Sequence, residues 1–274
     1  MKIFPDKRQL PLFLLRYAIL AGLVILGGCF MMSMPGKRHN GPLPPLTAEG
    51  QLLAKRLKED VTFLAGTIGE RNTNLYLQLQ QSAAYITDRL RRMGYTIREE
   101  TYLANNRKVV NIEAELKGAR QPDEIVVIGA HYDSPPESPG ANDNASGVAA
   151  MLELARQFKD VKSGRTVRFV AFVNEEPPYF RTELMGSRVY AANAKKRGDR
   201  IVAMLALETI GYYTDKPGSQ QYPPPINLFY PDTGNFIGFV SNLASRSLLH
   251  ASIKTFRETA HFPSEGVAAP EFIK

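Results

Sequence analysis

The sequence predicts a three-layer α/β/α sandwich around a mostly parallel, mixed sheet, preceded by one membrane-spanning helix. Two short runs, 125–130 and 167–173, are apolar apart from Arg168, which is typical of strands that helices cover on both faces. Between them, residues 146–158 carry apolar side chains at helical spacing. Alternation of strand, helix and strand favours parallel strands in one sheet. A nearly uninterrupted apolar stretch, Tyr17 to Met34, accounts for the preceding helix.

Residues 1–34 are predicted to be a signal-anchor segment. As a helix, Tyr17 to Met34 is about 27 Å long, close to the hydrocarbon thickness of a bilayer. The basic residues before it, which keep the N-terminus in the cytoplasm and send the rest of the chain across, are Lys2, Lys7, Arg8 and Arg16. The domain that follows is therefore expected to be membrane-anchored outside the cytoplasm.

A lipoprotein signal is the alternative for this segment, because Leu26-Gly27-Gly28-Cys29 resembles a lipoprotein processing box. The segment stays apolar past Cys29, however, and this favours an uncleaved anchor. Cys29 is the only cysteine, so we expect neither a disulfide nor thiol chemistry in the folded domain.

Residues 35–46 are rich in proline and glycine and are predicted to form a tether, which leaves 47–274 as the globular domain. The net charge of +7 is spread along the chain. Its densest basic clusters, 89–92 and 195–197, lie in helical patterns without interleaved aromatic residues. This argues against nucleic acid as a partner. Attraction of the excess positive charge to an anionic membrane surface is the better explanation.

The remaining elements follow from their spacing. Helices are expected at 48–65, 75–93 and 186–196, where apolar residues recur every three or four positions. Strands that show one face to water are expected at 95–102 and 108–116, and a third strand buried on both faces at 201–207. In such sheets ligands bind at the carboxyl ends of the strands.

Potential metal ligands stand at those ends. The first buried strand runs into His131-Tyr132-Asp133. Residues two apart in an extended chain share a face, so Asp133 can accept a hydrogen bond from the imidazole and leave its other nitrogen free for a metal. A His-x-Asp motif alone is more often a surface pair.

Carboxylates follow at three further places. Asp143 lies in a glycine-bounded turn, Gly140 to Gly147, that leads into a helix; it can cap that helix, or give one oxygen to each of two cations. Glu175 and Glu176 follow the second buried strand, so that one can bind a metal while the other faces the substrate water; Glu208 follows the third. Acids at strand ends are usually just solvated, but their coincidence at one sheet edge favours a metal centre.

Taken in order, these motifs resemble the co-catalytic zinc aminopeptidases of clan MH, which include bacterial leucyl aminopeptidases, aminopeptidase Y and glutamate carboxypeptidase. The resemblance runs from about Leu46 to the C-terminus. It implies a zinc-dependent exopeptidase, most often an aminopeptidase, that acts on peptide substrates. The metal ligands that it implies are His131, Asp143 as the bridge, Glu176 and Glu208; Glu175 is implied as general base and Asp133 as the acid that orients His131.

Two departures from the family pattern matter. Most relatives have Asp where this chain has Glu208, and their last ligand is a histidine in a loop near the C-terminus. We expect a C-terminally truncated form that binds about one tight zinc instead of the two of a complete site, with His261 as the one loop histidine that could substitute. Two alternatives stay open: a single-zinc enzyme like glutaminyl cyclase, and a non-catalytic membrane-tethered domain. The complete turn around Asp143 favours two metals and so a peptidase.

Overall fold

The computed structural model describes residues 10–222, 224 and 226–271. The chain divides into two compact units. One is the continuous segment Leu46–Tyr212, and the other joins Met1–Pro45 with Tyr213–Lys274. Each unit is described by itself.

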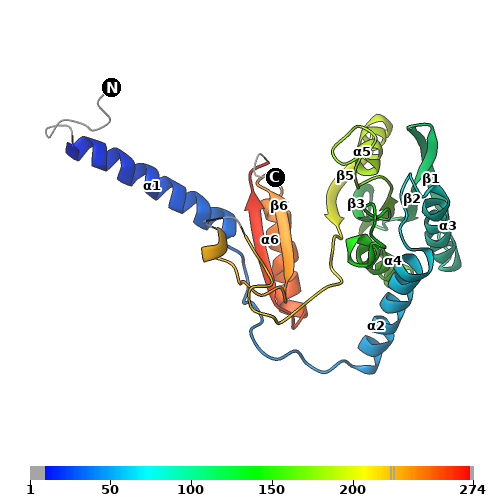
Figure 1. Ribbon diagram of the computed structural model, residues 1–274, viewed down its shortest axis with the longest axis horizontal. Helices are drawn as coiled ribbons and strands as arrows, with labels where there is room; N and C mark the ends of the chain where they lie inside the picture. Colours follow the sequence, from blue (N-terminus) through cyan, green and yellow to red (C-terminus); the bar gives the residue numbers. More distant parts are fainter. Residues whose placement is uncertain (1–9, 223, 225, 272–274) are drawn as a thin grey trace. The chain divides into compact units, whose positions relative to one another are not determined.

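A five-stranded mixed sheet with the order β1-β2-β4-β3-β5 forms the centre of the unit Leu46–Tyr212 (Figure 1). Its strands are β1 (Ile97–Ala104), β2 (Arg107–Leu116), β3 (Gln121–His131), β4 (Arg165–Phe172) and β5 (Arg200–Ala206). β1 and β2 run antiparallel to their neighbours, whereas β3 is parallel to both β4 and β5. The predicted mixed sheet is confirmed.

Helices cover both faces of this sheet. The helices are α2 (Ala48–Val61), α3 (Tyr76–Arg92), α4 (Gly147–Phe158) and α5 (Gly186–Arg197). Apolar residues of α3 and α4 belong to the larger core, and residues of α5 join strand residues in a second, smaller core. This arrangement is the predicted α/β/α sandwich. The first predicted helix differs in its ending: the α-helix stops at Val61, and Thr62–Ile68 continue as a π-helical turn, because the Gly69 amide bonds back five residues to the Leu64 carbonyl.

The burial predicted for the last strand of this sheet is wrong. We expected 201–207 to be covered on both faces, but Ile201, Val202 and Met204 are 36%, 43% and 44% exposed. Among the residues described, β5 pairs only with β3 and forms the sheet edge, whereas β4 lies between β2 and β3 and is buried along almost its whole length. The apolar run therefore predicted a strand correctly, whereas the burial of that strand depends on its position at the edge of the sheet.

The second unit contains helix α1 (Leu10–Met32), which is long and apolar enough to cross a membrane and lies near the N-terminus, where a signal sequence has the same character. The same unit holds a parallel strand pair, β6 (Ile237–Asn242) and β7 (Ser264–Ala269), with α6 (Arg246–Thr259) between them in sequence and a short 3-10 turn, Ile226–Leu228. Arg246 of α6 donates to the Phe30 carbonyl near the end of α1. Arg257 of α6 donates to the carbonyl of Pro35.

Candidate metal centre

The carboxyl ends of three neighbouring strands bring the predicted site residues to one edge of the sheet. His131 is the last residue of β3 and pairs with Phe172 at the end of β4. Glu175 and Glu176 follow β4, and Glu208 follows β5. Asp143 comes from a turn, Ala141–Ser146, that leads into α4. Parallel strands place their carboxyl ends together, which is why residues up to 77 positions apart in the sequence meet here.

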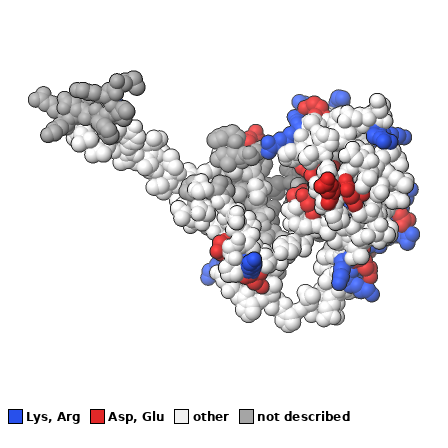
Figure 2. All heavy atoms as spheres, in the orientation of Figure 1, with Lys and Arg blue, Asp and Glu red and all other residues white. Residues whose placement is uncertain are grey.

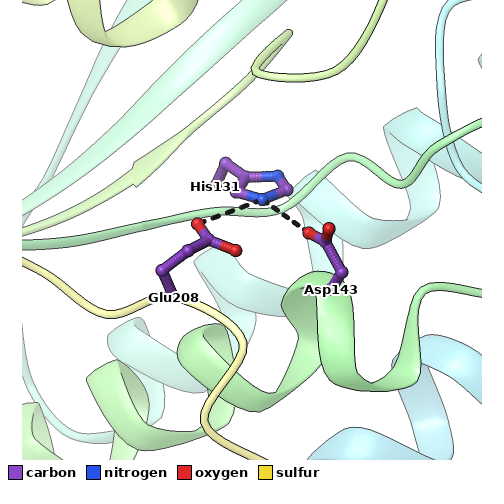
Figure 3. Close-up of side chains that lie close together, drawn as sticks. All are labelled: His131, Asp143 and Glu208. Atoms are coloured by element: carbon purple, nitrogen blue, oxygen red, sulfur yellow. Dashed lines mark ion pairs between the residues drawn. The ribbon is translucent and has the colours of Figure 1, made fainter. Parts of the chain in front are cut away.

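His131 lies at the centre of the cluster. Its Nε2 is 3.0 Å from Asp143 Oδ1 and 3.4 Å from Glu208 Oε2, and the three side chains converge in Figure 3. Ligand atoms of His131, Asp143 and Glu208 all lie within 4.8 Å of one another, as do those of His131, Glu175 and Glu176. His131 is 3% exposed, whereas the Asp143 and Glu208 side chains are half-buried. The arrangement presents one imidazole nitrogen and several carboxylate oxygens to one point.

Asp133 contacts the second nitrogen of the imidazole and accepts hydrogen bonds from the start of the loop after β4. Its Oδ1 is 3.3 Å from His131 Nδ1, and it accepts the Glu175 amide at 3.1 Å. Its Oδ2 accepts the Glu176 amide at 3.0 Å. A proton on Nδ1 would be donated to Asp133 and would leave Nε2 as a lone pair directed at the other carboxylates.

Asn144 joins the turn that carries Asp143 to the segment after β5. Its Nδ2 donates to the Leu207 carbonyl at 2.9 Å and to Glu208 Oε2 at 3.2 Å, and its Oδ1 accepts the amide of Gly147 at 3.0 Å. The fit is close, since a Cβ on Gly147 would lie 2.3 Å from the Leu207 carbonyl oxygen. Sequence reasoning did not single out Asn144. The only available signal was its place beside Asp143 in the turn.

The charges in the cluster oppose one another. Burial and the nearby Asp143 charge raise the pKa of Glu176 to about 7, and burial raises the pKa of Glu175. Burial would lower the pKa of His131, but the adjacent carboxylates of Asp133, Asp143 and Glu208 outweigh it and raise the value to about 12. Figure 2 shows acidic atoms gathered on one face of this unit. So many carboxylates around a single imidazole favour a bound cation.

The residues fit a divalent cation such as zinc. Three buried polar atoms of this cluster have no hydrogen-bond partner among the described residues: His131 Nε2, Asp143 Oδ1 and Glu176 Oε1. Unsatisfied buried polar atoms are costly, so their clustering needs an explanation. An imidazole nitrogen with carboxylate oxygens is a ligand set that zinc takes in catalytic sites.

An α/β/α sandwich with this ligand set at the carboxyl ends of its parallel strands is the arrangement of a metal-dependent enzyme. The sequence profile described as Peptidase family M28 matches residues 111–257. The chain belongs to peptidase family M28, and the predicted resemblance to zinc aminopeptidases is confirmed.

Similar sequences include an uncharacterized Escherichia coli protein, YfbL, which is 34% identical over 241 residues, or 84% of this chain and 69% of that protein. Aminopeptidase YwaD of Bacillus subtilis is 47% identical over 101 residues, which cover 36% of this chain and 21% of the relative. Aminopeptidase Y of Saccharomyces cerevisiae is 42% identical over 89 residues, 32% of this chain and 16% of the relative. The chain thus matches only about a fifth of the length of these two aminopeptidases.

Solved structures share the fold. A zinc aminopeptidase from Bacillus subtilis superposes with a TM-score of 0.63 at 17% identity, over 84% of this chain and 81% of that one. A glutaminyl cyclase from Porphyromonas gingivalis gives 0.55 at 17% identity, over 80% and 77%. The same fold therefore occurs in proteins of both names, and the choice between them depends on the site.

Proposed function

We propose that this chain is a zinc-dependent aminopeptidase. The observation that supports it best is the convergence of His131, Asp143 and Glu208, whose ligand atoms lie within 4.8 Å of one another in a member of peptidase family M28. His131 Nε2 and Asp143 Oδ1, which are buried, make no hydrogen bond and lie 3.0 Å apart, add to this support.

In this proposal, His131, Asp143 and Glu208 hold one tight zinc. Glu176, with a share of the Asp143 carboxylate, offers a second and weaker position. Three protein ligands are usual for a catalytic zinc, and the first group supplies three whereas the second supplies two. Asp133 orients His131 through Nδ1 and fixes the backbone of both glutamates.

Glu175 is the proposed general base. Its carboxylate is half-buried, and Oε2 lies 3.9 Å from His131 Nε2, next to the proposed zinc position. Burial raises its pKa from the ordinary value of 4.5, which moves it toward the range suited to proton transfer near neutral pH. Zinc, when bound, supplies Lewis-acid activation of a water molecule and of the scissile carbonyl. Glu175 takes the water proton as the C–O bond forms and passes it to the amine nitrogen as the C–N bond breaks.

A paired-substrate assay with the full chain tests this function. An aminoacyl chromogenic substrate and its N-acetylated match are incubated with zinc-loaded protein, with protein treated with a chelator, and with chelated protein resupplied with zinc. We expect zinc-dependent release from the free-amine substrate alone. A peptide that begins with glutamine is the third arm: ammonia release without cleavage would make the chain a cyclase, and no turnover at a full zinc load would make it a non-catalytic domain.

We also propose that residues 1–34 anchor this activity in the membrane with the peptidase domain, residues 47–274, outside the cytoplasm, and that 35–46 join the two. The support is the apolar helix α1 and the absence of helix or strand between Ser33 and Thr47.

A further inference from the structure

A buried arginine lies behind the proposed metal centre. Arg71 is 0% exposed and belongs to the loop between the π turn and α3. Its guanidinium donates to three carbonyls of one loop: Nε to Tyr132 at 2.7 Å, Nη1 to Pro139 at 2.6 Å and Nη2 to Gly140 at 2.8 Å. No carboxylate forms an ion pair with it within the described ranges.

The carbonyls that it binds lie at the two ends of the segment that separates two proposed ligands. Tyr132 directly follows His131, and Gly140 directly precedes the turn that contains Asp143. One planar group with donors in a fixed fork therefore spans both ends of the segment. Gly140 has a φ of +60°, and a Cβ there would lie 2.5 Å from Ser134 Cβ and 3.1 Å from Arg71 Nη2, so the loop closes tightly around the arginine.

The backbone of Arg71 is bonded to the same segment. Its amide donates to Ser134 Oγ at 3.1 Å, and its carbonyl accepts the Ser134 amide at 3.0 Å. The connection between the two loops therefore depends on backbone and side chain together, and a change at either residue should loosen it.

A buried guanidinium bonded only to neutral carbonyls is expensive, and neutral donors could tie a loop at lower cost. Burial lowers the pKa of Arg71 to about 10, against the opposing negative charges of Asp133 and Asp143, so the group is still charged at neutral pH. The positive charge acts on the carboxylates of Asp133 and Asp143 and offsets part of their mutual repulsion before a cation binds. This electrostatic effect explains why the residue is an arginine, whereas neutral donors would suffice to connect the loop.

We propose that Arg71 is a positioning residue of the metal centre, which fixes the separation of His131 and Asp143 so that the site is formed before zinc arrives. The inference rests on the proposed function, because it concerns the same ligands.

The test is zinc affinity, measured by competition with a chromogenic chelator, in full-chain Arg71→Lys and Arg71→Gln. A lysine keeps the charge, but one ammonium does not reproduce the fork that spans both ends. We expect both variants to bind zinc about 10- to 100-fold more weakly, the usual effect of losing an outer-shell partner. The matched control is Arg168→Lys, since Arg168 is also buried but bonds the carboxylates of Glu115 and Asp199. It should lose stability with less than a twofold change in zinc affinity.

Equal zinc affinity in the Arg71→Lys and Arg168→Lys proteins would overturn the proposal. If neither Arg71 variant folds, Ser134→Ala decides: a weaker zinc affinity with an unchanged fold supports the proposal, and an unchanged affinity overturns it. A wild-type chain that binds zinc but cleaves nothing would contradict the proposed function and leave this comparison of affinities intact.

Discussion

Replacement of Asp133 by asparagine should weaken zinc binding without removing a proposed ligand, because Asp133 positions His131 and the backbone of Glu175 and Glu176. Asp133 is 2% exposed; its two oxygens accept the Glu175 and Glu176 amides, and Oδ1 also lies 3.3 Å from His131 Nδ1. An asparagine keeps one oxygen. Its amide nitrogen should take the Oδ2 position, where it would leave one donor, the Glu176 amide, without an acceptor. At the Oδ1 position it would face both the Glu175 amide and His131.

The magnitude follows from that geometry. One buried donor left without an acceptor costs about 1–3 kcal/mol of unfolding free energy. The His131 ring also loses the negative charge behind it, which lowers the basicity of Nε2, and zinc affinity should fall about 10- to 100-fold.

Two measurements check the result: chemical unfolding of the zinc-free chain, followed by tyrosine fluorescence because the sequence has no tryptophan, and chelator competition for zinc. Asp60→Asn is the control, since Asp60 is equally buried and bonds Tyr85 and Arg89. It should lose stability alone. A zinc affinity for Asp133→Asn within twofold of the control would refute the reasoning.

Three other perturbations have defined outcomes. Asp143→Ala should lose more bound zinc than His131→Ala, because one carboxylate serves both proposed positions; equal losses in metal analysis would contradict a shared carboxylate. Burial would raise the pKa of Glu153, but hydrogen bonds from Arg156, Arg56 and Gln157 lower it from 4.5 to about 2. Its stabilisation is therefore present above pH 4.5 and lost as the pH falls toward 2. Glu153→Gln should cost about 1–2 kcal/mol at pH 7 after solvent screening, and a cost independent of pH in unfolding curves would contradict the assignment. Finally, Cys29→Ser should leave the chain in the membrane fraction, whereas its release or the loss of a lipid label would favour a lipoprotein.

The sequence predicted the elements of the unit Leu46–Tyr212 well because their periodicity is a local property, whereas β6, α6 and β7 were not predicted. The runs at β3 and β4 and the helical spacing of α4 and α5 need no knowledge of the rest of the chain. Burial of β5 was mispredicted, since an apolar run shows that a strand can be covered and says nothing of its neighbours. Ile201 and Met204 are exposed because β5 has one partner in its unit.

The site was predictable where chemistry and topology coincide. His131, Asp143 and Glu208 stand at strand ends or in a turn with a recognisable pattern, and the fold brings them together. Asn144 and Arg71 were missed for a different reason. Both residues contribute through hydrogen bonds to carbonyls and amides distant in sequence, and neither their residue type nor their spacing predicts such bonds.

The most direct test of the account compares the wild-type chain with Glu175→Gln. Zinc content and turnover of the aminoacyl substrate are measured on the same preparations, so that metal loss and loss of the base are separated. The account predicts equal zinc and a turnover reduced by about 10²- to 10⁴-fold, because the substitution removes a proton acceptor and no proposed ligand. Wild-type turnover in the glutamine variant at equal zinc would contradict it.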